Sequence, residues 1–467
     1  MNYLSNKKMF LKNIEVKDEE GTNKIFPNDF KAKDKLENEI KEEINKEFFQ
    51  ILRKDKMTDE DSKLVRKFVE SYIKTNKYFF QDFEDYKIFV DMIINDIFGL
   101  GVLENYLNNP DIQEIWVLGK DNIFYEEKGI RKKSTLRFKN DKIIVSMINK
   151  ILAPINRKAD ESTPKVDGTL PDGSRVAITM PPVALDGPQI VIRKFKKEKF
   201  TIWEYIKYGS ATMNMAKFLS KSVEWGANIL VVGGTGSGKT TLLNALGNEI
   251  PHDRGEEHII TIEDSAELIV HSPFLQRWET KNNNSEGRGE VSASELVKHS
   301  LRNSPDRIWL GETRDKVAYD VLQAAITGHK GTMTTIHADN AARAVDRFNT
   351  LASSSGIISV EDSKRLFSEA FDLIVVMEKV ITPKGEIKRV ISQITHVVGV
   401  GKLGAEKSGV KNTAKIDEDR VYLQDVYKYN TKTGNFITTG YIPKTMIDKA
   451  IMERREYDMS IFNKEEA

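Results

Sequence analysis

A glycine-rich segment between residues 233 and 240 has the residue types and the spacing of a phosphate-binding loop. It reads Gly-Gly-Thr-Gly-Ser-Gly-Lys-Thr and matches G-x-x-x-x-G-K-[ST] between an apolar run and a helical stretch. Glycines let backbone N–H groups approach phosphate oxygens without a Cβ in the way, and the following helix directs its N-terminal partial charge at the anion. A chance glycine-rich turn would lack this context. The residues expected to contact a nucleotide are Gly233, Gly234, Thr235, Gly236, Ser237, Gly238, Lys239, Thr240 and Thr241.

Two side chains of this loop have distinct predicted roles. Lys239 is expected to reach the β- and γ-phosphates of the nucleotide, and Thr240 is expected to place its hydroxyl on Mg²⁺. The predicted cofactors are therefore ATP and Mg²⁺.

Glu312 follows a second apolar run, residues 307–310, and is separated from it only by Gly311. A carboxylate just past a predicted strand is placed to polarise attacking water or to accept its proton. Glu312 is therefore a candidate catalytic residue. The alternative is a carboxylate that caps the next helix.

A further acidic segment, residues 262–267, also lies just past a predicted strand. Strand ends on one edge of a parallel sheet converge on the ligand crevice. Asp264 and Glu267 are therefore expected to share the metal shell with Thr240 and Glu312, and Glu267 is also expected to act on the water. Taken alone, such a cluster is more often a solvated turn.

Histidines and arginines supply candidate contacts to the terminal phosphate. His337 follows a predicted strand and His329 follows a predicted helix, so both are candidates for sensing the γ-phosphate, whereas a lone histidine is usually structural. Phosphoryl transfer also gains from a cation that meets the developing charge. Arg175 and Arg193, from the same chain or a neighbour, are candidates for this contact. Most arginines are surface or ion-pair residues, so the pattern alone does not select these two.

Short apolar runs that alternate with helical stretches must position these side chains. Runs of this length are typical of a largely parallel sheet covered by helices on both faces. The carboxyl ends of its strands would bring the phosphate loop and the acidic residues together. The predicted strands are 228–232, 258–262, 307–310, 332–336 and 372–376.

The chain as a whole divides into segments of different character, judged by periodicity, turn residues and polarity. The predicted boundaries are a flexible polar segment at 1–33, a helical region at 34–97, an α+β domain at 98–200, a linker at 201–214, an ATPase domain at 215–400, and a C-terminal charged insertion, hairpin and helix at 401–467.

Composition sets a few limits on partners. The 71 basic and 70 acidic side chains give a net charge of +1. No global field therefore indicates nucleic acid or an anionic membrane, and direct nucleic-acid binding is not predicted. The absence of cysteine excludes thiolate metal sites and fits a reducing compartment. No window approaches the roughly 18 apolar residues of a membrane span, so membrane association is expected to be peripheral or through partners.

The chain resembles the type II/IV secretion ATPase family, the traffic ATPases of secretion, pili and conjugation. The resemblance covers about residues 98–400. Because the chain has no cysteine, it lacks the tetracysteine motif of one branch and is more similar to the branch of Tad-type pili and type IV secretion. Thr313 stands where the family more often has an apolar residue. The matching segments are 99–104, 112–117, 160–162, 170–175, 185–188, 192–195, 233–240, 262–267, 301–302, 305–307, 311–314, 327–329 and 334–338.

The resemblance implies a fold and an assembly. The fold is α/β: a RecA-like P-loop NTPase domain with a largely parallel sheet, preceded by a smaller α+β N-terminal domain and a helical N-terminal extension. The implied assembly is a homohexamer with nucleotide between the two domains, which gives Arg175 and Arg193 a reason to contact phosphate. The implied location is cytoplasmic, peripheral at the cytoplasmic face of the membrane, with inner-membrane platform proteins as partners. ATP hydrolysis would then power secretion, pilus assembly or conjugative transfer.

Two other functions fit parts of the pattern. RecA-like rings also move nucleic acids, so a nucleic-acid-translocating motor is one alternative; the histidine motif and the upstream domain argue against it. The other is a nucleotide-gated assembly scaffold without turnover. The complete set of lysine, hydroxyl, glutamate and histidine argues against that scaffold.

Overall fold

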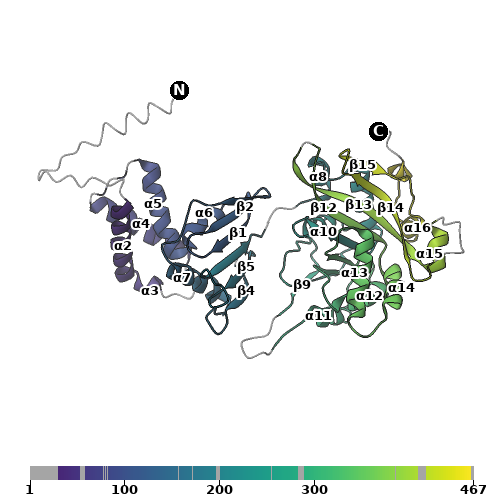
Figure 1. Cartoon of the computed structure of the whole chain (residues 1–467), viewed down its shortest axis with the longest axis horizontal. Coiled ribbons are helices and arrows are strands. Elements are labelled where there is room, and N and C mark those ends of the chain that lie inside the picture. Colours follow the sequence, from purple (N-terminus) through teal and green to yellow (C-terminus); the bar gives the residue numbers. More distant parts are fainter. Residues whose placement is uncertain are drawn as a thin grey trace, which may run out of the picture. The chain divides into compact units, whose positions relative to one another are not determined.

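The protein is described from a computed structural model, in which two compact units divide between residues 196 and 197 (Figure 1). The predicted flexible segment lies outside the described residues up to residue 29. The described residues are 30–52, 58–76, 78, 80, 82–155, 157–170, 172–195, 200–253, 255–281, 289–383, 385–408 and 417–463.

The first unit begins with helices, of which α2 (Phe30–Glu47), α4 (Asp59–Thr75) and α5 (Phe83–Phe98) pack around an apolar core of their own. Helix α4 starts with a capping box, in which Thr58 and Asp61 each accept a hydrogen bond from the other's backbone N–H. Helix α5 lies within the predicted helical region, and its residues Phe89 and Ile93 are buried on one face. The bounds are α2 (Phe30–Glu47), α3 (Phe49–Leu52), α4 (Asp59–Thr75), α5 (Phe83–Phe98), η1 (Gly101–Leu103) and α6 (Glu104–Leu107).

An antiparallel sheet with the strand order β3-β2-β1-β6-β5-β4 forms the rest of the first unit. Helix α7 shares its core, because Ile144 and Ile148 are buried together with Ile115 and Ile190 of the sheet. The bounds are β1 (Ile112–Leu118), β2 (Ile123–Glu127), β3 (Ile130–Lys133), α7 (Asp141–Leu152), η2 (Ala153–Ile155), β4 (Lys165–Thr169), β5 (Arg175–Thr179) and β6 (Gln189–Arg193).

The second unit is built on a sheet with the order β15-β14-β13-β12-β7-β11-β10-β8-β9. The run from β12 to β9 is parallel, whereas β13, β14 and β15 add antiparallel strands at one side. Successive residues of β7 point to opposite faces: Ile229 and Val231 belong to one core, Leu230 and Val232 to the other. A strand buried on both faces needs the continuous apolar run that the sequence shows. The predicted α/β fold class is confirmed.

Each of the five strands predicted for this sheet overlaps an observed strand. The long antiparallel strand β13 and the outer strand β9 were not among them. The bounds are α8 (Ile202–Lys207), α9 (Met213–Glu224), β7 (Ile229–Gly233), α10 (Lys239–Gly247), β8 (Ile259–Glu263), β9 (Leu275–Glu279), α11 (Ala293–Ser300), β10 (Arg307–Leu310), α12 (Val317–Ile326), β11 (Met333–Ile336), α13 (Ala341–Ser353), α14 (Val360–Ala370), β12 (Leu373–Ile381), β13 (Ile387–Val400), α15 (Gly401–Lys407), β14 (Val421–Asn430), β15 (Asn435–Thr438), α16 (Lys444–Met452) and η4 (Met459–Phe462).

Two predicted boundaries differ from the structure. The predicted linker at 201–214 holds helix α8, and Ile202 and Tyr205 of that helix are buried in the second unit's core. The predicted C-terminal segment is also part of this unit, since β14 pairs with β13 and Tyr427 is buried. Among the described residues, no helix combines the length and the apolar character needed to cross a bilayer.

A buried histidine fastens the C-terminal helix to this sheet. His396 of β13 is 2% exposed, and its ring nitrogens contact the Tyr441 hydroxyl at 2.9 Å and the Thr445 hydroxyl at 2.6 Å. Burial, with a smaller effect of the Lys407 charge, lowers the pKa of His396 to about 4. The ordinary pKa is about 6.5, so the unfolded chain binds the extra proton first as pH falls. The contribution of His396 to the free energy of unfolding is therefore fully present above about pH 6.5 and declines as pH falls toward 4.

We expect His396 alone to lower the free energy of unfolding by about 2 kcal/mol when the pH falls from about 7.5 to about 5. Urea denaturation of the wild type and of His396→Gln at both pH values measures it, because glutamine cannot acquire the charge. The variant should lose about 2 kcal/mol less than the wild type. Equal losses in the wild type and His396→Gln would contradict the assignment.

Candidate functional site

The glycine-rich segment connects the end of β7 to the start of α10, as the motif requires. Gly236 and Gly238 have φ angles of +69° and +99°, in the left-handed region where a side chain is strained. A Cβ built on Gly234 or Gly236 would meet no heavy atom within 4 Å, so the top of the loop is open. The positive φ angles explain why residues 236 and 238 are glycines. The open space at Gly234 and Gly236 leaves room for an anion beside the backbone amides.

Two buried polar groups face the inside of this loop. Lys239, 8% exposed, donates from Nζ to the carbonyl oxygens of Gly233 and Gly234, at 3.0 Å each. The hydroxyl of Ser237 is buried and has no hydrogen-bond partner among the described residues. A buried hydroxyl without a partner is costly, and a phosphate oxygen would satisfy it. These groups fit the predicted phosphate site.

Three predicted residues converge beside the loop. Nζ of Lys239 lies 3.4 Å from Nε2 of His337, and the same Nε2 lies 3.4 Å from Oε1 of Glu312. The other oxygen of Glu312 accepts a hydrogen bond from Nη2 of Arg314 at 2.7 Å. These side chains lie close together because β7, β11 and β10 are neighbouring parallel strands, and the carboxyl ends of parallel strands lie on the same side of the sheet.

Charge in this cluster favours an ionised glutamate and a neutral histidine. Burial acts to raise the pKa of Glu312, but the hydrogen bond and charge of Arg314, helped by Lys239 and His337, hold it below its ordinary value. Burial and the Lys239 charge lower the pKa of His337, against the opposing effect of Glu312. The site therefore holds a carboxylate and a neutral imidazole near pH 7.

The acidic segment after β8 is held in place by a residue that the sequence did not single out. Glu263 is 4% exposed, and its Oε2 accepts from the backbone N–H of Glu267 at 2.8 Å and of Leu268 at 3.0 Å. Burial raises its pKa to about 7. Asn244 of α10 donates to the Glu267 carbonyl at 3.1 Å. Glu263 ends a buried strand, which was the signal for it; no sequence pattern marks Asn244.

Asp264 lies at the outer end of the same polar network. It is exposed, accepts from the Thr280 hydroxyl at 3.1 Å, and lies 3.6 Å from Nη1 of Arg314, which also holds Glu312. Thr313, unusual for the resemblance, is buried and its hydroxyl lies 2.7 Å from that of Thr334. Its polarity is therefore satisfied within the sheet edge.

The described residues do not form a metal site by themselves. No three His, Asp or Glu side chains among them are grouped closely enough to hold an ion. Mg²⁺ commonly binds through one or two protein oxygens together with substrate phosphates and water. Thr240, half-buried on the first turn of α10, has the oxygen and the position for this type of site. The residues present thus fit Mg²⁺ that arrives with a nucleotide.

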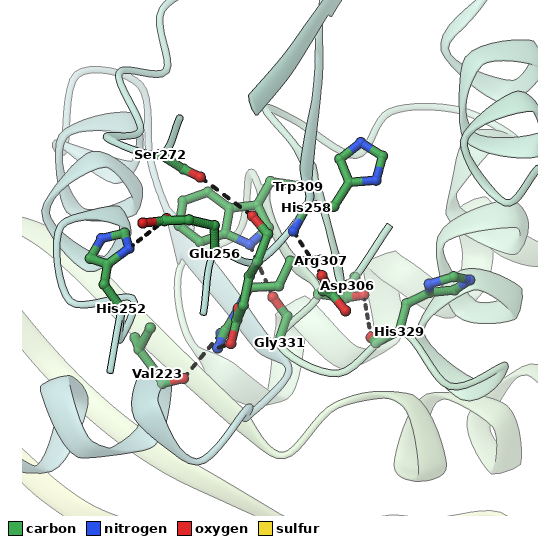
Figure 2. Close-up of polar contacts among 12 residues, drawn as sticks. Val223, His252, Glu256, His258, Ser272, Asp306, Arg307, Trp309, His329 and Gly331 are labelled. Carbon is green, nitrogen blue, oxygen red and sulfur yellow. Dashed lines mark hydrogen bonds and ion pairs between the residues drawn. The ribbon is translucent and has the colours of Figure 1, made fainter. Parts of the chain in front are cut away.

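The two candidate histidines lie at opposite ends of the parallel strands: His337 at the carboxyl ends and His329 at the amino ends. Nδ1 of His329 lies 2.8 Å from the carbonyl oxygen of Pro305, which precedes β10. Figure 2 shows His329 beside Asp306 and Arg307, where the parallel strands begin. Buried Arg307 binds Glu257 and donates to the Val223 carbonyl at 3.0 Å. The prediction that His329 senses the γ-phosphate is therefore wrong for a nucleotide in this subunit's own loop, because the phosphate loop follows the carboxyl end of β7.

A cavity of about 360 Å³ lies at the amino ends of these strands, which are called the amino edge of the sheet below. Its lining residues include Glu224, Glu257, Arg307 and Lys330. It is separate from the phosphate loop, whose top is open rather than enclosed.

The two candidate arginines lie in the first unit and are direct neighbours there. Arg175 of β5 is opposite Arg193 of β6, and Arg193 is also opposite Glu114 of β1. The charge of Arg193 opposes the effect of burial, which raises the pKa of Glu114. Both arginines therefore belong to one short stretch of sheet; their contact with a nucleotide stays a prediction.

Comparison with known proteins gives consistent matches. The family model described as type II/IV secretion system protein matches residues 98–458. Uncharacterized protein MJ0781 of Methanocaldococcus jannaschii is 38% identical over 245 residues, which are 50% of this chain and 33% of that protein, so the chain spans about a third of this relative's length. Type IV secretion system protein PtlH of Bordetella pertussis is 30% identical over 311 residues, 60% of this chain and 90% of that protein.

Among solved structures, the VirB11 ATPase from the Brucella suis type IV secretion system, crystallised in complex with sulphate, is similar at 26% sequence identity. The match covers 62% of this chain and 91% of that chain, with a TM-score of 0.34.

Proposed function

The chain belongs to the type II/IV secretion system family of ATPases, and from this premise we propose that it is an ATP-hydrolysing motor subunit that energises a secretion, pilus-assembly or conjugative transfer machine. The observation that carries the proposal is the convergence of Lys239, His337 and Glu312 beside an open phosphate loop. In this proposal the terminal phosphate of ATP lies beside the Lys239 ammonium, the neutral His337 imidazole and the Glu312 carboxylate.

Each side chain has a role in this proposal. Lys239 exchanges its two carbonyl contacts for phosphate oxygens, and Ser237 donates its hydroxyl to the same group. Glu312, ionised and held by Arg314, orients the attacking water and takes its proton. Glu267 assists from the neighbouring strand end. Mg²⁺, when bound, would neutralise phosphate charge, with Thr240 as its direct ligand and the carboxylates of Asp264, Glu267 and Glu312 around it.

The assembly is part of the same proposal. A homohexamer at the cytoplasmic face of the membrane, in contact with inner-membrane platform proteins, would turn closure of the first unit over the nucleotide into force. Arg175 and Arg193 would meet the phosphates on closure. The relative PtlH, a type IV secretion system protein, supports this class of machine.

Phosphate release from Mg·ATP tests the proposal and separates it from a nucleic-acid motor. The purified full chain should hydrolyse ATP at a rate that single- and double-stranded DNA leave unchanged. A rate that rises severalfold with DNA and falls again with salt would support the nucleic-acid motor instead. Tight nucleotide binding with no turnover, even with membrane partners present, would support a nucleotide-gated scaffold.

A further inference from the structure

An arginine that the sequence did not single out contacts the phosphate loop from the side opposite Glu312. Arg389 lies on β13, and its Nε donates to the carbonyl oxygen of Gly236 at 2.8 Å. Its Cδ would lie 3.7 Å from a Cβ built on Gly238, so the arginine stem lies against the start of α10. Two points of contact hold the guanidinium at the open part of the loop.

The order of the strands indicates which side of the loop each end of a bound nucleotide would occupy. Glu312 and His337 follow β10 and β11, on one side of β7, whereas Arg389 belongs to β13, on the other side beyond β12. If the terminal phosphate points toward Glu312, the rest of the nucleotide must leave the loop toward β12 and β13. Arg389 is therefore beside the α-phosphate and ribose rather than the γ-phosphate.

The chemistry of the side chain fits this position. Arg389 is half-buried, its Nε is bound to Gly236, and the structure gives no partner for its terminal nitrogens among the described residues. An arginine fork binds phosphate oxygens in a plane and is always charged. Lys379, opposite Arg389 in the β12–β13 register, adds a second positive charge on this hairpin.

We propose that Arg389 binds the α-phosphate of the nucleotide from the β13 side of the loop. The proposal rests on the proposed function, because it needs a nucleotide in this loop. It adds a contact that is common to ATP and ADP and independent of the catalytic glutamate.

Equilibrium binding of ADP and of Mg·ATP to the full chain tests this proposal with paired substitutions. Arg389→Gln keeps a donor for the Gly236 carbonyl but removes the charge, and Arg389→Lys keeps the charge. Arg389→Gln should weaken ADP and ATP binding by the same factor, about tenfold, and Arg389→Lys should recover part of the loss. Lys388→Gln, which removes a charge from the preceding residue of β13, is the matched control and should bind both nucleotides as the wild type does.

The contrary outcomes are separable. ADP binding by Arg389→Gln at wild-type strength would reduce Arg389 to a support for the loop and overturn the inference. A loss confined to ATP would place Arg389 at the γ-phosphate and overturn it as well. A wild type that binds neither nucleotide would overturn the proposed function together with this inference.

Discussion

Replacing Lys239 by alanine is expected to lower ATP hydrolysis by about a hundredfold or more. The substitution removes the one ammonium group that is buried inside the phosphate loop and within 3.4 Å of His337. Its charge is predicted to offset the charge of the β- and γ-phosphates, so both nucleotide affinity and turnover should decline. Steady-state phosphate release and binding of a fluorescent ATP analogue measure the two effects.

Lys217 provides the matched control for this experiment. It is an exposed lysine on α9 of the same unit, and Lys217→Ala should hydrolyse ATP at the wild-type rate. Thermal denaturation should show that both variants are folded. Near-normal turnover by a folded Lys239→Ala protein would mean that the triphosphate does not lie in this loop.

Replacing Glu312 by glutamine should stop hydrolysis while ATP still binds. Glutamine has nearly the same shape and can still accept the hydrogen bond from Arg314, but it cannot take a proton from water. We expect turnover to drop by about a hundredfold or more, with little change in the affinity for Mg·ATP. Rapid-quench measurement of a single turnover should find the bound nucleotide still as ATP.

A surface glutamate on α14 serves as control, because Glu361→Gln changes the same group away from the loop. If Glu312→Gln releases phosphate at the wild-type rate, the residue has no part in catalysis. The buried Glu263 and the predicted Glu267 would then be the carboxylates to examine next.

The parts of the site that depend on local pattern could be predicted from the sequence. The phosphate loop is contiguous, and its glycines and lysine have fixed relative positions once a strand precedes it and a helix follows. The apolar runs that became β7, β8, β10 and β11 are buried on both faces, so their composition alone marks them. His337 follows such a run directly and Glu312 follows one after Gly311, which is why both could be named.

The parts that depend on tertiary arrangement could not. His329 and His337 both lie near strand ends in sequence, but only strand direction tells which edge of the sheet each one occupies. Arg389 reaches the loop from β13, a strand that was not predicted and that β12 separates from β7. The segment at 201–214 was predicted to be a linker, yet Tyr205 is buried in the core. Such contacts follow from pairing between distant segments, which periodicity does not encode.

In the proposed function, ATP lies in the loop around Ser237 and Gly238 with its terminal phosphate beside Glu312. The most direct test is an experimental structure of the full chain with Mg²⁺ and a non-hydrolysable ATP analogue. We expect the β-phosphate within the loop, Nζ of Lys239 moved from the two carbonyls to phosphate oxygens, and the γ-phosphate on the side of Glu312 and His337. A nucleotide bound elsewhere, such as the cavity at the amino edge beside Arg307, or a loop left empty at saturating analogue, would contradict it.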